Sequence, residues 1–249
     1  WDIRLPSGLQ IIADTVFNGC AALENIEIPD TVTVLGRGAF AGCASLRKME
    51  IPGSVRMIES GGSGMFSGSD SLATVTVAKS NTVYRSQSNC IIRRADGELV
   101  AGARPTLIPS GVKSIGSYAF SGCTGFTKVI MLQGVKSIGP YAFLGCTDLT
   151  EVVIPDGVES IGNFAFRNCA GLTSVVIPGS VESIGNGAFY QCRALASVTL
   201  SEGIKRLGKP SETDAERDSN VFGSCTSLRS LAIPSTVELI APGLTSDCA

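Results

Sequence analysis

Residues 154–172 read IPDGVESIGNFAFRNCAGL, and residues 177–195 read IPGSVESIGNGAFYQCRAL. Both stretches contain Ile-Pro, then Val-x-x-Ile-Gly, then Ala-Phe-x-x-Cys and a closing Leu, and they repeat with a period of 23 residues. A fixed period of this length indicates a stack of similar supersecondary units, each of which needs its neighbours to bury its apolar side.

The cysteines show how far the repeat extends along the chain. Cys90 lies outside the pattern and Ser69 takes the cysteine position in the third unit, so that the template fits nine units in all. The other cysteines share one repeat position: Cys20, Cys43, Cys123, Cys146, Cys169, Cys192, Cys225 and Cys248. These residues are predicted to form one column of inward-facing thiols.

Each unit can be read as one coil. In residues 149–154, alternation places Val152 and Ile154 on one side and Val153 on the other, which predicts a short strand that Pro155 ends. The following Ala-Phe-x-x-Cys segment, residues 165–169, is predicted to form a single helical or 3₁₀ turn. Stacked coils would pair their strands in parallel, so the expected fold is an α/β solenoid, right-handed, with about nine coils of 23 residues and a parallel sheet on its concave face.

The units resemble the BspA-like leucine-rich repeats, whose pattern is IP-x-x-V-x-x-IG-x-x-AF-x-x-C-x-x-L. Residues 109–200 match it almost without a break. The resemblance implies a leucine-rich-repeat protein of bacterial or protist cell surfaces, with adhesion to host proteins or other cells as its function. The matching residues are core positions, so the resemblance transfers no partner-binding residues.

Three segments interrupt the repeat within what is otherwise expected to be a single solenoid over residues 1–249. Residues 59–64 lengthen one corner and are expected to form a flexible loop. Residues 78–108 contain Asp96-Gly97 between apolar runs, which predicts a β-hairpin island. Residues 208–220 form a polar loop insertion.

Two functional interpretations of these interruptions are weak. Arg93 and Arg94 in the hairpin island could contact an acidic partner, but arginines of this kind more often form a solvated face. Asp214, Glu216 and Asp218 alternate, which is one spacing of calcium ligands, yet the glycine and distal glutamate of an EF-hand loop are not in register. We therefore expect no metal site.

Composition excludes several classes of function. The chain has 249 residues, 20 basic and 22 acidic side chains, and no histidine. Without histidine there is no Ser-His or Cys-His nucleophile pair. The net charge of −2, with no basic run, predicts no nucleic-acid partner, and no apolar stretch is long enough to span a membrane. Carboxylates such as Glu27, Glu50 and Glu151 lie on different coils, so no enzyme activity and no cofactor are expected.

The nine cysteines could suggest disulfides, but their regular spacing and odd number favour reduced structural thiols. Parallel Cβ directions in stacked coils fit disulfide torsion poorly. Cys90 is the more reactive candidate if it is exposed, although burial in its hairpin is the favoured interpretation.

The predicted binding site is the outward side of the concave sheet. The expected residues are Lys128, Ile130, Glu151, Val153 and Val176, of which the three apolar ones form a contiguous stripe. The alternative is that β-branched residues simply suit strands. The surface lacks Tyr, Trp or Arg anchors, which argues against very tight binding.

The predicted function is a non-catalytic protein-binding module, adhesin-like, at the cell surface or secreted, whose partner is another protein. The alternative is a structural subunit within a larger assembly, which could be intracellular. The chain ends at Ala249 without a polar cap, so further residues or a neighbouring subunit would have to cover the ends of the solenoid.

Overall fold

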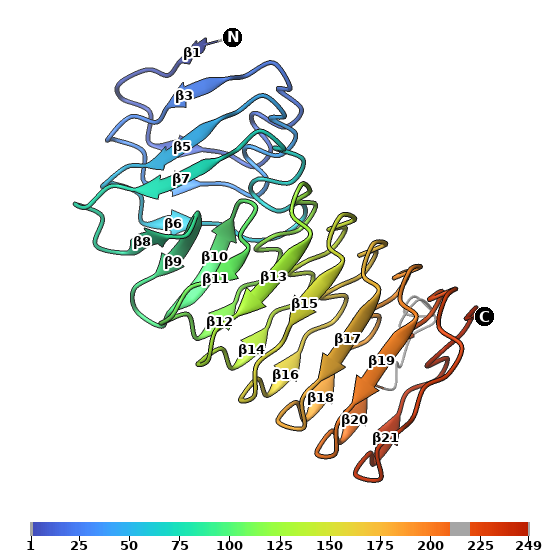
Figure 1. Ribbon diagram of the computed structural model, residues 1–249. Coiled ribbons are helices and arrows are strands. Elements are labelled where there is room, and N and C mark those ends of the chain that lie inside the picture. Colours follow the sequence, from blue (N-terminus) through green and yellow to red (C-terminus); the bar gives the residue numbers. More distant parts are fainter. Residues whose placement is uncertain (1, 210–219, 249) are drawn as a thin grey trace.

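The computed structural model describes residues 2–209 and 220–248 as a stack of β-coils (Figure 1). Most coils contribute one long strand and one two-residue strand. The long strands are β1 (Asp2–Arg4), β3 (Asn25–Glu27), β5 (Lys48–Ile51), β7 (Thr74–Val77), β11 (Leu107–Ile108), β13 (Lys128–Met131), β15 (Glu151–Val153), β17 (Ser174–Ile177) and β19 (Ser197–Leu200), although β11 is shortened to two residues. The two-residue strands are β2 (Ile11–Ile12), β4 (Val34–Leu35), β6 (Met57–Ile58), β12 (Ser114–Ile115), β14 (Ser137–Ile138), β16 (Ser160–Ile161), β18 (Ser183–Ile184), β20 (Arg206–Leu207) and β21 (Leu239–Ile240).

Strands of equivalent coils pair in parallel. The longer strands form a sheet in the order β11-β13-β15-β17-β19, and the pairs β1-β3 and β5-β7 precede it. The two-residue strands form a second set of ladders, β2-β4-β6 and the run from β12 to β21. The parallel solenoid of about nine coils is therefore confirmed, but it also has a second ladder, at the Val-x-x-Ile positions of the repeat, for which the sequence analysis predicted no strand.

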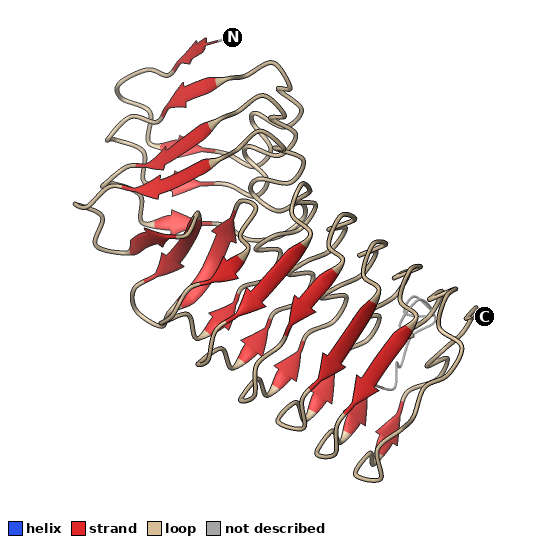
Figure 2. Ribbon diagram, viewed as in Figure 1, coloured by secondary structure: helices blue, strands red, loops and turns tan. Residues whose placement is uncertain are grey.

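The prediction of helical or 3₁₀ turns is wrong, because the described residues contain no helix (Figure 2). The Ala-Phe-x-x-Cys segments are chains of tight turns. In the segment that ends at Cys169, for example, Asn168 (φ 56°) has a left-handed backbone, as does Phe164 (φ 55°) just before the segment. A right-handed α-helix cannot contain such residues. Alternate backbone N–H groups of these segments donate to the next coil, as when Phe143 donates to the carbonyl of Ala165 at 2.7 Å, while the others bond within their own coil.

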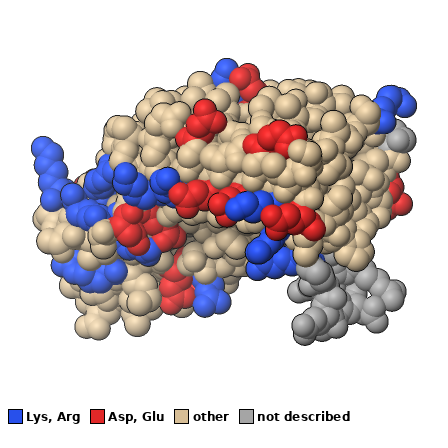
Figure 3. All heavy atoms as spheres, turned by 90° about the horizontal axis from the view of Figure 1, so that it is seen from below, with Lys and Arg blue, Asp and Glu red and all other residues tan. Residues whose placement is uncertain are grey.

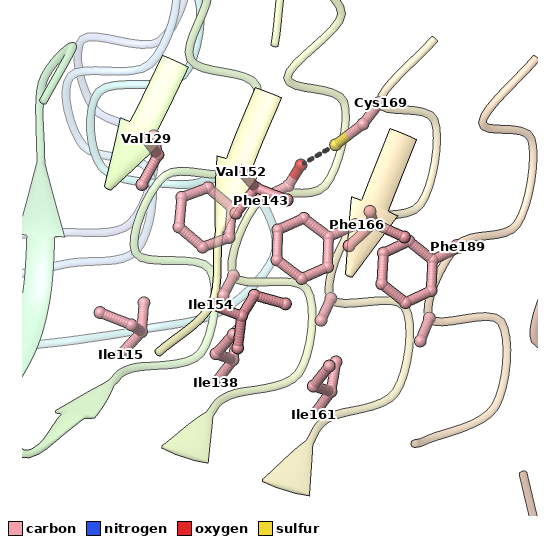
Figure 4. Close-up of a cluster of buried hydrophobic side chains, with 14 of the residues drawn as sticks. Ile115, Val129, Ile138, Phe143, Val152, Ile154, Ile161, Phe166, Cys169 and Phe189 are labelled. Atoms are coloured by element: carbon pink, nitrogen blue, oxygen red, sulfur yellow. Dashed lines mark hydrogen bonds between the residues drawn. The ribbon is translucent and has the colours of Figure 1, made fainter. Parts of the chain in front are cut away.

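The core is a column of identical side chains. The rings of Phe143, Phe166 and Phe189 stack with centroids 5.0 and 5.2 Å apart (Figure 4). Ile138 and Ile161 form a neighbouring buried row. Because each ring is covered by the ring of the next coil, burial is complete only inside the stack, as the repeat pattern predicts.

An antiparallel unit interrupts the stack where the sequence predicted a hairpin. It consists of β8 (Tyr84–Gln87), β9 (Cys90–Arg93) and β10 (Glu98–Gly102). The side chains of β9 alternate between two apolar clusters: Ile91 packs with residues of the N-terminal arm (2–77), whereas Cys90 and Ile92 pack with the C-terminal arm (107–248). The unit is thus a shared wall between two cores.

This unit also accounts for the change of direction between the two arms in Figure 1. On the side of the turns the coils remain in direct contact, because Gly68 donates a backbone hydrogen bond to Gly122 at 2.9 Å. On the side of the strands, β8 to β10 are inserted between β7 and the C-terminal arm. An insertion on one side of a stack, but not the other, forces a bend.

The polar insertion is described only at its edges. Lys209 donates its N–H to Oδ1 of Asn186 at 2.5 Å. Residues 210–219, which include Asp214, Glu216 and Asp218, lie outside the described residues.

Candidate binding surface

The outward side of the long-strand sheet in the C-terminal arm, called the strand face below, brings together all five residues predicted as a binding site. Strand register pairs Lys128 with Glu151 and Ile130 with Val153 on β13 and β15. Val176 follows on β17, where it pairs with Thr199 of β19. Parallel pairing fixes these positions because a slip by one residue would bury the outward row.

The apolar residues of the strand face form a contiguous stripe that water reaches. Val153 is 39% exposed and Val176 is 59% exposed, while Ile130 is half-buried. Leu107, 37% exposed, pairs with Ile130 and extends the row by one coil. Sequence analysis missed Leu107 because the hairpin insertion hides the repeat there, although Ile108-Pro109 marks the same strand end as Ile154-Pro155. The four residues Leu107, Ile130, Val153 and Val176 are called the apolar stripe below.

An ion pair lies at the other end of the same strands. Nζ of Lys128 is 2.7 Å from Oε1 of Glu151, and both side chains are about half exposed. Such a pair contributes little to stability in water. It does fix two opposite charges beside the apolar stripe.

A shallow hollow lies on the strand face. A depression of 470 Å³ lies among Leu132, Val153, Asp156, Val176 and Ser201. A wider one of 1080 Å³ lies on the N-terminal arm, where Arg4, Glu27, Lys48 and Glu50 line it with both signs of charge. Neither is the enclosed apolar pocket that binding of a small molecule would need.

Several surface charges are paired between neighbouring coils. Lys136 lies 2.8 Å from Glu159, and Lys205 lies 3.5 Å from Glu182. Acidic and basic side chains adjoin one another on the face seen from below in Figure 3. In the hairpin unit, Arg93 contacts both Asp96 and Glu98, and the Arg94 guanidinium donates to the carbonyl of Tyr84 at 2.9 Å. Arg93 and Arg94 therefore interact within the hairpin.

The repeated cysteines have a specific role in packing. The thiol of Cys169 donates to the carbonyl oxygen of Phe143 in the preceding coil at 3.1 Å (Figure 4). Cys192 makes the equivalent bond to Phe166 at 3.1 Å. Ser69 does the same with its hydroxyl, donating to Phe40 at 2.8 Å. This repeat position therefore favours a small side chain that can donate a hydrogen bond to the preceding coil. Serine meets both conditions, which explains why it replaces cysteine in the third unit.

The buried thiols are poor nucleophiles. All nine cysteines are free thiols in the structure. Burial raises the pKa of Cys123 and of Cys225 to about 12, and that of Cys43 to about 11. Cys90, outside the column, is fully buried in β9 and burial raises its pKa to about 12. These groups stay protonated at neutral pH, and a protonated thiol does not react.

Some kinds of site are absent from the described ranges. Residues 2–209 and 220–248 contain no cluster of His, Cys, Asp and Glu side chains that could hold a metal ion. They also contain no helix suited to crossing a membrane.

Comparison with known proteins identifies the family. The model of the BspA type leucine rich repeat region matches six copies over residues 1–93 and 106–212. The chain therefore belongs to the BspA-type leucine-rich repeat family. No curated protein matches it.

Solved structures with the same fold come from bacteria. A leucine rich cell surface protein of Faecalibacterium prausnitzii is 26% identical with a TM-score of 0.73, over 97% of this chain and 60% of that one. A leucine-rich repeat protein of Eubacterium ventriosum is 23% identical with a TM-score of 0.57, over 99% of this chain and 82% of that one. The pneumococcal vaccine antigen PcpA is 20% identical with a TM-score of 0.52, over 94% of this chain and 66% of that one. The chain thus spans about 60% of the Faecalibacterium protein.

Proposed function

We propose that this chain is a non-catalytic protein-binding module of a cell-surface or secreted protein, with an adhesin-like role, and that its partner docks on the strand face, the expected concave side of the solenoid. The observation that carries the proposal is the apolar stripe, which stays at least partly exposed across four consecutive strands of one ladder, whereas the inward positions of the same strands, such as Val129, Val152 and Val175, are buried. Contiguous exposed apolar surface of this kind is typical of interaction sites.

The stripe is well suited to a protein partner. Its residues are held by the parallel ladder β11-β13-β15-β17, so little conformational entropy is lost on docking. The Lys128–Glu151 pair supplies charged groups at its border, where they favour orientation rather than affinity. The shallow relief fits a broad protein surface better than a small ligand.

The family and the neighbours support the cellular setting. The chain belongs to a leucine-rich repeat family, and the Faecalibacterium neighbour is a cell surface protein. Repeat scaffolds of this type present long rigid binding surfaces.

The test compares partner capture by three versions of the chain. Proteins exposed on host cells and on neighbouring bacteria are cross-linked to the immobilised wild-type chain, to a variant with Val153→Asp and Val176→Asp, and to a Met57→Asp control. Met57 is 52% exposed on β6, away from the strand face. We expect the double variant to lose a partner that the wild type and the control both capture, with all three equally folded by circular dichroism. Equal capture by all three would refute the strand face as the binding site.

A further inference from the structure

A second surface lies on the turns that follow β12, β14, β16 and β18, and is called the turn face below. Its segments 116–124, 139–147, 162–170 and 185–193 contain no Asp or Glu. Three of the four tyrosines of the chain lie here, at Tyr118, Tyr141 and Tyr190. The segments of the turn face are therefore rich in aromatic residues and carry no carboxylate of their own, although the Asp70 carboxylate accepts a hydrogen bond from Thr124 at the end of the first segment.

The aromatic residues of the turn face form a stack separate from the core phenylalanines. The rings of Tyr118 and Tyr141 are 4.7 Å apart and nearly parallel, and that of Phe164 continues the stack at 5.1 Å from Tyr141. All three side chains are half-buried. Because the rings cover one another's faces, the exposed parts of the stack are the positively polarised ring edges and the hydroxyls of the two tyrosines.

The backbone conformation at these positions does not favour aromatic residues. Tyr118, Tyr141 and Phe164 have φ of 59°, 57° and 55°, a left-handed conformation that bulky residues adopt at a cost. The same repeat position holds Gly38 and Gly187, with φ of 56° and 60°. Because glycine satisfies the fold at this position, three consecutive aromatic residues indicate a role other than folding.

Arg167 completes the turn face. Its guanidinium carbon lies 5.4 Å from the ring centre of Phe164 and 5.1 Å from that of Tyr190, between the two rings. Among the described residues it forms no ion pair and its side chain donates no hydrogen bond to a protein oxygen. The planar group is held in place by the rings, with its N–H donors available to a partner.

We propose that the turn face is a second docking surface, which binds a partner-protein segment carrying a carboxylate for Arg167 and apolar side chains for the edges of the aromatic stack. Charge complementarity supports this occupant, because segments without acidic residues and an unpaired guanidinium favour a carboxylate. Tyrosine and arginine are also the residue types that concentrate binding energy at interfaces. The apolar stripe of the strand face contains neither tyrosine nor arginine. The two surfaces therefore share no residues and would be recognised by different chemistry.

The test uses short randomised peptides selected on the immobilised full chain, with the enriched peptides resynthesised and their dissociation constants measured by calorimetry. We expect them to contain Asp or Glu beside apolar residues. Arg167→Gln should weaken their binding by about tenfold or more, and replacing the peptide carboxylate by its amide should cause a similar loss. The two changes together should cost little more than either alone, since both remove one interaction.

Three control variants test whether binding depends on this guanidinium and on this face. Arg229→Gln removes an exposed arginine that lies outside the four segments of the turn face, and should leave affinity unchanged. Arg167→Lys retains the charge but not the planar fork, and should also weaken binding. The Val153→Asp, Val176→Asp variant should bind these peptides normally, which distinguishes the turn face from the strand face. Selected peptides without a carboxylate, or peptides that bind Arg167→Gln as well as the wild type, would overturn the proposal.

Discussion

The thiol of Cys169 and the carbonyl oxygen of Phe143 are joined by a hydrogen bond of 3.1 Å that links two successive coils. The same carbonyl also accepts the backbone N–H of Cys146 at 3.2 Å. The cysteine thus stabilises the stack in two ways, as a small buried side chain and as a donor that joins one coil to the one before it.

Replacing Cys169 should separate these two contributions. Cys169→Ser keeps the donor, as Ser69 does in the third unit, whereas Cys169→Ala removes it and leaves a small cavity. We expect Ala to lower the free energy of unfolding by about 1–2 kcal/mol, and Ser to lower it by less. Urea unfolding monitored by circular dichroism measures both. If Ala were the less damaging replacement, the thiol would be an apolar filler only.

Thiol accessibility should follow burial. Cys20 and Cys248 are partly exposed, and the structure buries the other seven cysteines. In the native chain, we expect Ellman's reagent to modify Cys20 and Cys248 first, and to reach the rest only after unfolding. Denatured but unreduced protein should then give nine free thiols. A lower total would show disulfides and contradict the reduced column.

Stability should fall in alkaline solution. Burial raises the pKa of Cys123 and Cys225 from 9.0 to about 12. The unfolded chain therefore loses these protons from about pH 9, while the folded chain keeps them. Their stabilisation is complete below pH 9 and declines between pH 9 and 12, by about 1.4 kcal/mol per pH unit for each thiol. Urea midpoints at pH 7, 9 and 10.5 measure the decline, which should be shallower in Cys123→Ser. An equal slope in that variant would assign the effect to other groups.

Gly102 should tolerate no side chain. A Cβ there would lie 2.3 Å from Cε1 of Phe120, the first ring of the C-terminal stack. Gly102→Ala should lower the free energy of unfolding by about 1–3 kcal/mol through overpacking. Gly8→Ala is the matched control, because a Cβ at Gly8 would meet no atom within 4 Å and the φ of this residue is not left-handed. Similar thermal midpoints for both variants would show that the hairpin unit moves freely against Phe120.

The Lys128–Glu151 pair should matter little for stability. Its side chains are 44% and 50% exposed, so a double-mutant cycle of Lys128→Gln and Glu151→Gln should give a coupling of less than about 1 kcal/mol. Chemical denaturation of the four proteins measures it. A larger coupling would mean that changes at this pair alter folding, so any effect on partner binding could not be attributed to the strand face.

The repeat made much of the architecture predictable. Val152 and Ile154 were expected inward and Val153 outward, and the structure places them so. The hairpin predicted at Asp96-Gly97 lies in the antiparallel unit. The sequence did not predict the third strand, β8, or that the side chains of β9 pack into two different apolar clusters. The helical turns were mispredicted because apolar spacing of three residues is compatible with a series of tight turns as well as with a helix.

The sequence by itself determined the stacked coils, the buried columns and the outward row of the strand face. These follow from a period that sets, within each coil, which side chains must be covered. Only the tertiary structure decided the thiol bonds between coils, the bend at the hairpin unit, the extension of the stripe to Leu107 and the meeting of Arg167 with Phe164 and Tyr190. Each of these depends on the distance between atoms of different coils, or of different turns of one coil, which a one-dimensional pattern does not specify.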